Sequence, residues 1–231
     1  MAESAIDIDI KAQEQAILSA TRATARPQHS ITVSNPPWSA LDDLLGDEEE
    51  EVFEEALIPP ENFNMVSEYI YRSSFPKKKH FTFLKKLGLK SVLTLILEEY
   101  PAQNMKFLEE NNIKFLQFGI AGNKEPFVQI PEEKISAALA AMLDRRNHPM
   151  LIHCNKGKHR TGCLIGCLRK LQHWSYTSIF DEYRRFSHPK SRSMDQQFIE
   201  LFDTRQVWEL IDKEHMPNWP ILGKFSANPA G

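Results

Sequence analysis

The sequence is poor in the residues that mark several common protein classes. It contains three cysteines in 231 residues, and two of them, Cys163 and Cys167, lie four apart in an expected helix. That odd count and spacing argue against a secreted disulfide framework. No apolar run approaches the about 20 residues of a membrane span, and the N-terminal MAESAIDIDI has no signal-peptide pattern. We therefore expect no membrane span and a reducing compartment, the cytoplasm by default, with the nucleus left open.

Charge is distributed unevenly along the chain. The whole sequence has a formal net charge of -3, but residues 1–57 carry 13 acidic and 3 basic side chains, which leaves 25 basic and 18 acidic in residues 58–231. A basic domain of net +7 favours an anionic ligand. We predict a disordered acidic tail over 1–57, either solvated or docked on the basic domain, a globular domain over 58–215 and an irregular tail over 216–231.

Short apolar runs alternate with amphipathic segments through the globular region. This alternation predicts an α/β fold with a mostly parallel central sheet flanked by helices. Gly88 is the expected terminator of the first helix. We expect strands at 69–72, 90–97, 113–118 and 149–152, and helices at 80–87, 102–111, 131–146, 163–171, 176–186 and 194–213.

The most informative segment is the run HCNKGKHRTG at residues 153–162. It follows an apolar strand and precedes a helix, which places Cys154 on the turn between them. Backbone N–H groups at a helix start attract anions, and the same field with nearby Arg160 is expected to lower the Cys154 pKa. A thiolate beside a guanidinium that grips two oxygens is suited to attack on phosphate.

Each residue type in this run has an expected role. Cys154 attacks phosphorus to form a phosphocysteine that water hydrolyses, while Arg160 stabilises the transition-state charge. Gly157 permits a backbone conformation closed to most residues, and Thr161 is placed to hydrogen-bond the thiolate or the phosphoenzyme. His153 either orients the loop or is a satisfied core histidine. Binding of the phosphate is expected from Asn155, Lys156, Gly157, Lys158, His159 and Thr161.

The run matches the CxxxxxR signature of the cysteine-dependent phosphatases. Together with FGIAGNKEPF upstream and EYRRFSHPKSRSMDQQFIELFD downstream, it resembles the fungal and plant atypical dual-specificity phosphatases over about residues 58–215. The resemblance implies the dual-specificity phosphatase fold and cleavage of inositol pyrophosphates without a cofactor or metal. It also implies that Ile120, Asn123 and Lys124, on a facing loop, approach the inositol phosphates.

The facing loop, residues 119–127, has no aspartate to protonate a leaving group, and its one carboxylate is Glu125. Releasing a tyrosine oxygen generates a group of pKa about 10, whereas a phosphate monoester released from a diphosphate has a pKa of about 6. Acid catalysis is therefore dispensable for a phosphoanhydride substrate. We favour a loop-structuring role for Glu125 over that of general acid.

Other interpretations remain open at this point. The same chemistry would serve a protein tyrosine or dual-specificity phosphatase, or a phosphoinositide phosphatase. A non-catalytic phosphate-binding scaffold is disfavoured because Cys154 and Arg160 are both present. We expect no nucleic-acid partner. A second basic run is either a solvated helix end or part of the site's rim: Arg184, Arg185, Lys190 and Arg192. A zinc module lacks paired CxxC knuckles and would have to use His153, Cys154, His159, Cys163 and Cys167.

Overall fold

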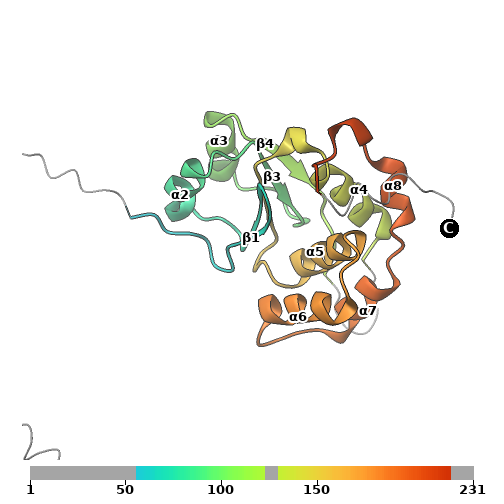
Figure 1. Ribbon diagram of the computed structural model, residues 1–231. Coiled ribbons are helices and arrows are strands. Elements are labelled where there is room, and N and C mark those ends of the chain that lie inside the picture. The colour runs from blue at the N-terminus through green and yellow to red at the C-terminus, as the bar shows by residue number, and fades with distance from the viewer. Residues whose placement is uncertain (1–55, 123–129, 220–231) are drawn as a thin grey trace, which may run out of the picture. The chain divides into compact units, whose positions relative to one another are not determined.

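A five-stranded sheet with the order β1-β2-β5-β3-β4 forms the centre of the fold (Figure 1). The computed structural model describes residues 56–122 and 130–219. Strand β1 runs antiparallel to β2, and the remaining neighbours are parallel. The strands are β1 Asn64–Ser67, β2 Ile70–Ser73, β3 Ser91–Thr94, β4 Lys114–Gln117 and β5 Met150–His153.

Helices cover both faces of the sheet (Figure 1). The α-helices are α2 Phe81–Lys86, α3 Ala102–Glu110, α4 Glu132–Met142, α5 His159–Leu171, α6 Tyr176–Ser187, α7 Ser193–Leu201 and α8 Arg205–Leu210. The short 3-10 helices of the described residues are η2 Lys78–His80, η3 Arg145–Asn147 and η4 Lys213–His215. Helices α2 and α3 lie over one face, and the later helices pack over the other.

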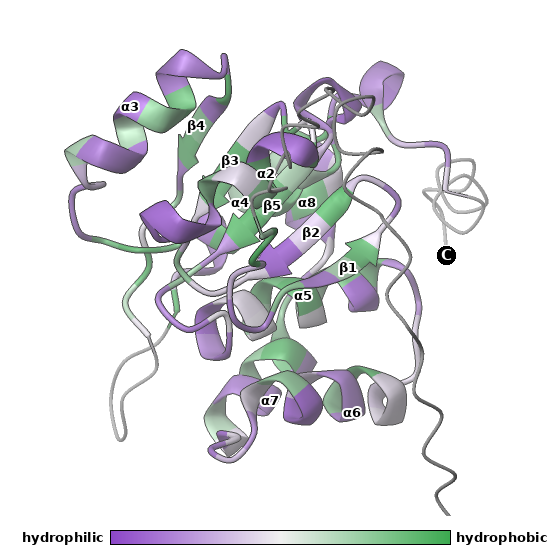
Figure 2. Ribbon diagram, turned by 90° about the vertical axis from the view of Figure 1, so that its left-hand side faces the viewer, coloured by the Kyte–Doolittle hydropathy of each residue, from purple (hydrophilic) through white to green (hydrophobic). Residues whose placement is uncertain are grey.

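The central strands divide their side chains between two cores because successive residues of a strand point to opposite faces. On β3, Val92 joins the smaller core with α2 and α3, whereas Leu93 joins the larger core with α4 and α5. Strand β5 does the same with Leu151 and Ile152. Figure 2 shows the hydrophobic residues concentrated on these strands. A strand buried on both faces reads as a continuous apolar run, which is why the sequence located β3 and β5.

Most expected elements are confirmed, with differences at their ends. The first helix ends before Gly88, which has a φ of +61°. The helix expected over 194–213 is wrong as a single element: it divides into α7 and α8, because the extended Phe202 is buried between them. The strand expected over 113–118 is β4, which lies at the sheet edge and is only half-buried. The short antiparallel β1 was not expected.

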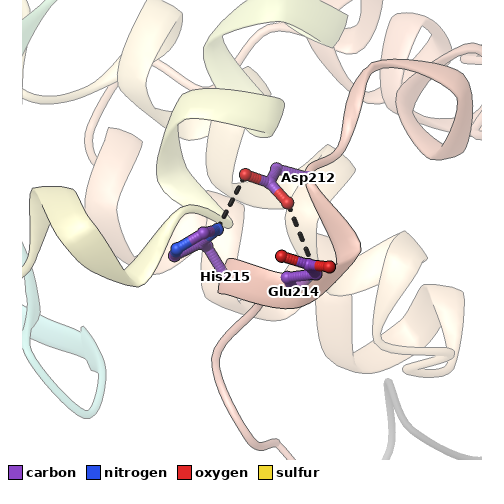
Figure 3. A group of neighbouring side chains, drawn as sticks. All are labelled: Asp212, Glu214 and His215. Atoms are coloured by element: carbon purple, nitrogen blue, oxygen red, sulfur yellow. Dashed lines mark hydrogen bonds and ion pairs between the residues drawn. The ribbon is translucent and has the colours of Figure 1, made fainter.

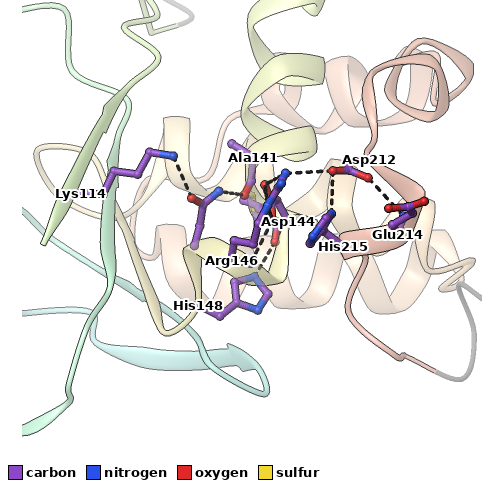
Figure 4. Close-up of polar contacts among 10 residues, drawn as sticks. Lys114, Ala141, Asp144, Arg146, His148, Asp212, Glu214 and His215 are labelled. Atoms are coloured by element: carbon purple, nitrogen blue, oxygen red, sulfur yellow. Dashed lines mark hydrogen bonds and ion pairs between the residues drawn. The ribbon is translucent and has the colours of Figure 1, made fainter.

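The helix expected to reach Arg146 ends earlier, and polar contacts fix the segment after it (Figure 4). Asp144 accepts a hydrogen bond from the Arg146 N–H and so caps η3. The Arg146 guanidinium bridges Asp144 and Asp212, at 2.8 and 3.0 Å. Asn147 donates to the Ala141 carbonyl at 2.9 Å. This network joins the end of α4 to the segment around η4.

The terminal segments are described only in part. The predicted acidic tail, residues 1–57, lies outside the described residues as far as residue 55. At the other end the description stops at Trp219, which packs against the larger core. Within residues 56–122 and 130–219, no helix has the length and apolar character required to cross a membrane.

Candidate active site

The parallel strands β3, β4 and β5 lead into a pocket of about 520 Å³ at their carboxyl ends, the edge where parallel α/β sheets place ligands. Cys154 follows β5 directly and is 4% exposed. Helix α5 begins five residues later, at His159. The predicted strand, turn and helix are therefore confirmed. The pocket is lined by Leu97, Glu98, Ala121, Gly122, Cys154, Asn155, Lys156, His159, Arg160 and Arg192.

The loop after Cys154, residues 154–158, turns three consecutive carbonyls toward the β2 side. The carbonyl of Asn155 accepts from the N–H of Phe75 at 3.1 Å. The Asn62 side chain donates to the carbonyls of Lys156 and Gly157, both at 3.3 Å. In a planar trans peptide the N–H points opposite to the preceding C=O. The N–H groups of residues 156–158 therefore point away from β2, toward the pocket, as an anion cradle requires.

Gly157 lets the loop lie directly on strand β2. Its φ is +64°, and a Cβ placed there would lie 2.4 Å from the carbonyl oxygen of Ser73. No side chain fits in that space, and the positive φ itself favours glycine. The predicted need for glycine at this position is confirmed, and the backbone of β2 explains it.

Arg72, on β2, is a residue of the site that the sequence reading missed. The residue is 1% exposed, and its guanidinium donates to the Gly157 carbonyl at 2.8 Å and stacks 3.8 Å from the centre of the Phe186 ring. Burial lowers the pKa of Arg72 to about 10, with nearby Glu182 and Cys154 partly offsetting the effect. The side chain remains a cation at neutral pH, beneath the loop that carries the thiol. An arginine within a short strand gave no signal in the sequence.

Arg160 is held at the pocket by two backbone carbonyls. Its Nη1 donates to the carbonyls of Leu95 and Ile120, at 3.1 and 3.2 Å. These carbonyls follow β3 and β4, so the ends of both strands orient the guanidinium. In the described part of the chain its Nε and Nη2 donate to no acceptor, and two such N–H groups form the fork that grips two phosphate oxygens.

His153 is buried and holds the backbone at Cys154. Its Nδ1 lies 3.2 Å from the Cys154 carbonyl, and its Nε2 lies 3.0 Å from the Tyr100 hydroxyl. A carbonyl only accepts, so Nδ1 carries the proton and Tyr100 donates to Nε2. Burial lowers the pKa of His153 to about 4. Both interpretations of the sequence therefore hold: His153 is a satisfied core histidine that also positions the loop.

The expected phosphate-binding residues do not all reach the pocket. Asn155, Lys156 and His159 line it, whereas the Lys158 amine donates to the His188 carbonyl at 2.6 Å. Within the described residues the buried hydroxyl of Thr161 has no hydrogen-bond partner, so no bond to the thiol is present. Ile120 is buried and contributes its carbonyl to Arg160. Outside the described residues lie Asn123, Lys124 and Glu125.

The second basic run divides between the two interpretations that the sequence allowed. Arg192 lines the pocket. Arg184 donates to Gln196 at 3.3 Å, and Arg185 pairs with Asp181 at 3.3 Å on the exposed side of α6. Arg192 is therefore part of the rim, whereas Arg184 and Arg185 belong to a solvated helix end.

One group of potential metal ligands occurs among the described residues, at η4 (Figure 3), and none of its members lines the pocket. The side chains of Asp212, Glu214 and His215 offer ligand atoms within 4.8 Å of one another. Their geometry is already explained: Asp212 accepts from the Glu214 N–H and from His215, and pairs with Arg146. None of the five candidate zinc ligands in the sequence belongs to this group.

The sequence is similar to a known family and to curated relatives. The model of the "Tyrosine phosphatase family" matches residues 57–222. The chain is 56% identical over 169 residues to the inositol diphosphatase SIW14 of Saccharomyces cerevisiae, which covers 73% of this chain and 59% of that protein. It is 56% identical over 154 residues to the inositol diphosphatase DSP2 of Oryza sativa subsp. japonica, which covers 67% of this chain and 76% of the relative.

Solved structures agree with the fold. The Siw14 catalytic core superposes with a TM-score of 0.66 at 56% identity, covering 68% of this chain and 94% of that one. The core catalytic domain of the PP-IP phosphatase SIW14 in complex with citrate gives a TM-score of 0.64 at 55% identity, covering 67% and 93%.

The fold is that of the cysteine phosphatases, with the signature thiol directly after β5 and the signature arginine in the first turn of α5. The chain belongs to the tyrosine phosphatase family, as the signature predicted. It spans about 59% of the length of the yeast relative.

Proposed function

We propose that this protein is an inositol-pyrophosphate phosphatase, which removes the terminal phosphate of a diphospho group on an inositol polyphosphate. Cys154 is the nucleophile and forms a phosphocysteine that water then hydrolyses. Arg160 binds the equatorial oxygens of the phosphoryl group in the transition state. The backbone N–H groups of residues 156–158 bind the remaining oxygens.

The observation that carries this proposal is the pocket itself. It brings together the Cys154 thiol, the N–H face of the loop and the Arg160 guanidinium, which is fixed by two carbonyls. Pre-oriented donors of this kind stabilise a phosphoryl transition state because they need no reorganisation during the reaction.

The substrate class is supported by the charge of the pocket wall. Beyond Arg160, the pocket is lined by Lys156, His159 and Arg192. The N–H groups of the loop and the Arg160 guanidinium suffice to bind one phosphoryl group. The additional basic groups therefore suit a ligand that carries several phosphates. The curated relatives named inositol diphosphatase provide independent support.

The leaving group supports the same substrate. An inositol phosphate released from a diphosphate is a stable anion at neutral pH, with a pKa of about 6, so its departure needs no strong proton donor. Residues 119–127 contain no aspartate that could protonate a tyrosine oxygen.

A phosphotyrosine or other phosphoprotein substrate is the second candidate, and one observation favours it. Glu98 lines the pocket and is the one carboxylate among the described residues that do so. If it were protonated, it would offer the acid that a basic leaving group requires.

Turnover of a substrate panel tests the proposal. The purified chain should release phosphate from a diphosphoinositol polyphosphate with a kcat/KM at least about a hundredfold above that for a phosphotyrosine peptide. Cys154→Ser should abolish turnover of both while still binding inorganic phosphate. Preference for the phosphopeptide would overturn the substrate assignment, and activity that survives in Cys154→Ser would overturn the mechanism.

We further propose that the protein acts in the cytoplasm. All three cysteines are free thiols. A thiol nucleophile functions in a reducing environment, where disulfide formation is disfavoured.

A further inference from the structure

A buried carboxylate lies behind the phosphate pocket. Asp195, in the first turn of α7, has a side chain that is 1% exposed. It accepts a hydrogen bond from the Tyr183 hydroxyl at 2.6 Å and lies 3.3 Å from Nδ1 of His159. Burial and the adjacent Asp195 raise the pKa of Cys163 well above its usual range, so that thiol stays protonated beside the carboxylate. A buried charge persists only when it is paired in this way.

The hydrogen bonds determine which nitrogen of His159 carries a proton. The single hydrogen of the Tyr183 hydroxyl goes to Asp195, and its oxygen also accepts from the Arg192 N–H at 3.2 Å. Nδ1 of His159 lies 3.3 Å from that oxygen and 3.3 Å from Asp195 Oδ2, both of which face it as acceptors. Nδ1 must therefore carry hydrogen.

This arrangement presents the other ring nitrogen to the pocket. His159 is half-buried and lines the pocket beside Cys154 and Arg160. With Nδ1 turned toward Asp195, Nε2 is the nitrogen that a ligand in the pocket can reach. Neutral imidazole offers a lone pair there, which repels a phosphate oxygen, whereas imidazolium offers an N–H and a positive charge.

We propose that Asp195 is a positioning residue that orients His159 with Nε2 facing the phosphate pocket, so that Nε2 takes up a proton together with a phosphate ligand and the affinity for that ligand depends on this proton. The inference deepens the proposed function, because it concerns recognition in the same site. It requires no bond-making beyond proton uptake from solvent when the anion binds.

Charged and titratable groups surround the imidazole. The loop and helix that carry His159 contribute Cys154, Lys156, Lys158, Arg160 and Cys163. Helix α6 contributes Tyr183, and α7 with the residue before it contributes Asp195 and Arg192. The loop after β3 contributes Glu98. Lys156, Arg160 and Arg192 disfavour a further positive charge on the ring, whereas the carboxylate of Asp195 favours one. A bound phosphate offsets the charge of these cations. Ligand and proton should therefore bind together.

The first test measures competitive inhibition by inorganic phosphate, with a small chromogenic aryl phosphate as substrate, between pH 5.5 and 8.5. Asp195→Asn keeps the shape of the side chain and removes its charge. The inhibition constant of the variant should exceed that of the wild type about tenfold at pH 6, the value of one charge-assisted hydrogen bond, and match it within about twofold at pH 8.5. Ionisation of phosphate itself is common to both proteins and cancels in the ratio.

Two further variants separate a proton effect from a fold defect. Asp181→Asn makes the same change on the exposed side of α6, where the carboxylate pairs with Arg185. The ratio of its inhibition constant to that of the wild type should stay at one across the pH range. His159→Gln should remove the same pH dependence while Asp195 is intact. A ratio for Asp195→Asn that is constant across the pH range would overturn the proposal and assign Asp195 to packing alone.

Nitrogen-detected NMR of the histidine side chains in the wild-type chain provides a test without a variant. His159 should show a protonated Nδ1, and adding phosphate at pH 7 should protonate Nε2 as well. A neutral ring protonated on Nε2 would overturn the assignment. Both experiments use phosphate ion, so they remain decisive if the diphosphoinositol substrate proves wrong.

Discussion

The Arg72 guanidinium donates to the carbonyl of Gly157 at 2.8 Å, and this bond ties strand β2 to the loop that carries the candidate nucleophile. The bond is buried. Together with the hydrogen bonds from Asn62, it holds the carbonyls of the loop toward β2 and away from the pocket. The N–H face of the loop is therefore set from behind by a side chain that does not line the pocket.

Replacing Arg72 by methionine should impair catalysis more than folding. The change removes the charged hydrogen bond to the Gly157 carbonyl, so the free energy of unfolding should fall by about 1–3 kcal/mol. The kcat should fall about 10- to 100-fold because the loop shifts. Urea unfolding and steady-state kinetics measure the two effects. Arg185→Met, on the exposed part of α6, is the control and should change neither by much. A fall in stability with unchanged kcat would contradict the positioning role.

Gly157 and Gly88 form a matched pair for testing the contact between the loop and β2. Both have a positive φ, but a Cβ at Gly88 meets nothing within 4 Å. Gly88→Ala should cost about 1–2 kcal/mol of stability and leave activity intact. Gly157→Ala should lower kcat/KM by about a hundredfold or more, because the loop must move away from Ser73. Similar activities for the two variants would show that the loop tolerates displacement.

Lys156 and Lys158 should differ in their effect on a highly charged substrate. Lys156 lines the pocket, whereas the Lys158 amine is bound to the His188 carbonyl. Lys156→Ala should raise the KM for a diphosphoinositol polyphosphate about tenfold and that for a small aryl phosphate less than threefold. Lys158→Ala should change both less than threefold. Equal losses on the two substrates would remove Lys156 from substrate recognition.

Glu98 distinguishes the two candidate substrates. A carboxylate at the pocket mouth repels a polyanion, so Glu98→Gln should lower the KM for the diphosphoinositol substrate about two- to threefold at low salt and leave kcat unchanged. The effect should shrink as salt is added. If kcat on that substrate instead fell more than tenfold, Glu98 would be a proton donor and the leaving-group argument would fail.

His153 should make the protein less stable in mild acid. Burial lowers the pKa of His153 to about 4 in the folded chain, against about 6.5 when unfolded. As the pH falls from 6.5 toward 4, the unfolded state takes up a proton that the folded state excludes. The contribution of His153 to the free energy of unfolding is fully present above pH 6.5, and it declines by up to about 3 kcal/mol by pH 4.

The measurement is the unfolding free energy in urea at several pH values. His153→Gln should give a shallower pH dependence than the wild type, while His80 and His148, whose pKa values burial also lowers, contribute equally to both proteins. Parallel curves for the two proteins would contradict the assignment of a neutral, buried His153.

The sequence indicated the chemistry of the site because its key atoms are local. Cys154, Gly157 and Arg160 lie within seven residues, and the apolar strand and the helix on either side determine their arrangement. The alternation of apolar segments likewise predicted the parallel sheet. What the sequence could not reveal was the support from distant segments. Arg72 and Asn62 meet the loop across 85 to 95 residues, and no periodicity marks such contacts.

The errors in the fold have physical causes of the same kind. Residues 194–213 have a helical pattern, but the helix is interrupted where Phe202 is buried in the larger core. Lys158 and His159 are neighbours in the motif and looked equivalent. Their side chains diverge because His188 and Asp195, on the connection and helix that come after α6, bind them separately.

Because the loop at Gly157 rests on main-chain atoms of Ser73, with no side chain between them, the floor of the pocket takes its shape from the sheet backbone. Substitutions among the apolar side chains of either core would reach that floor only by bending strand β2. The side chains of Glu98 and Arg192 at the rim could therefore be substituted to alter selectivity while the position of the loop that carries Cys154 stays unchanged.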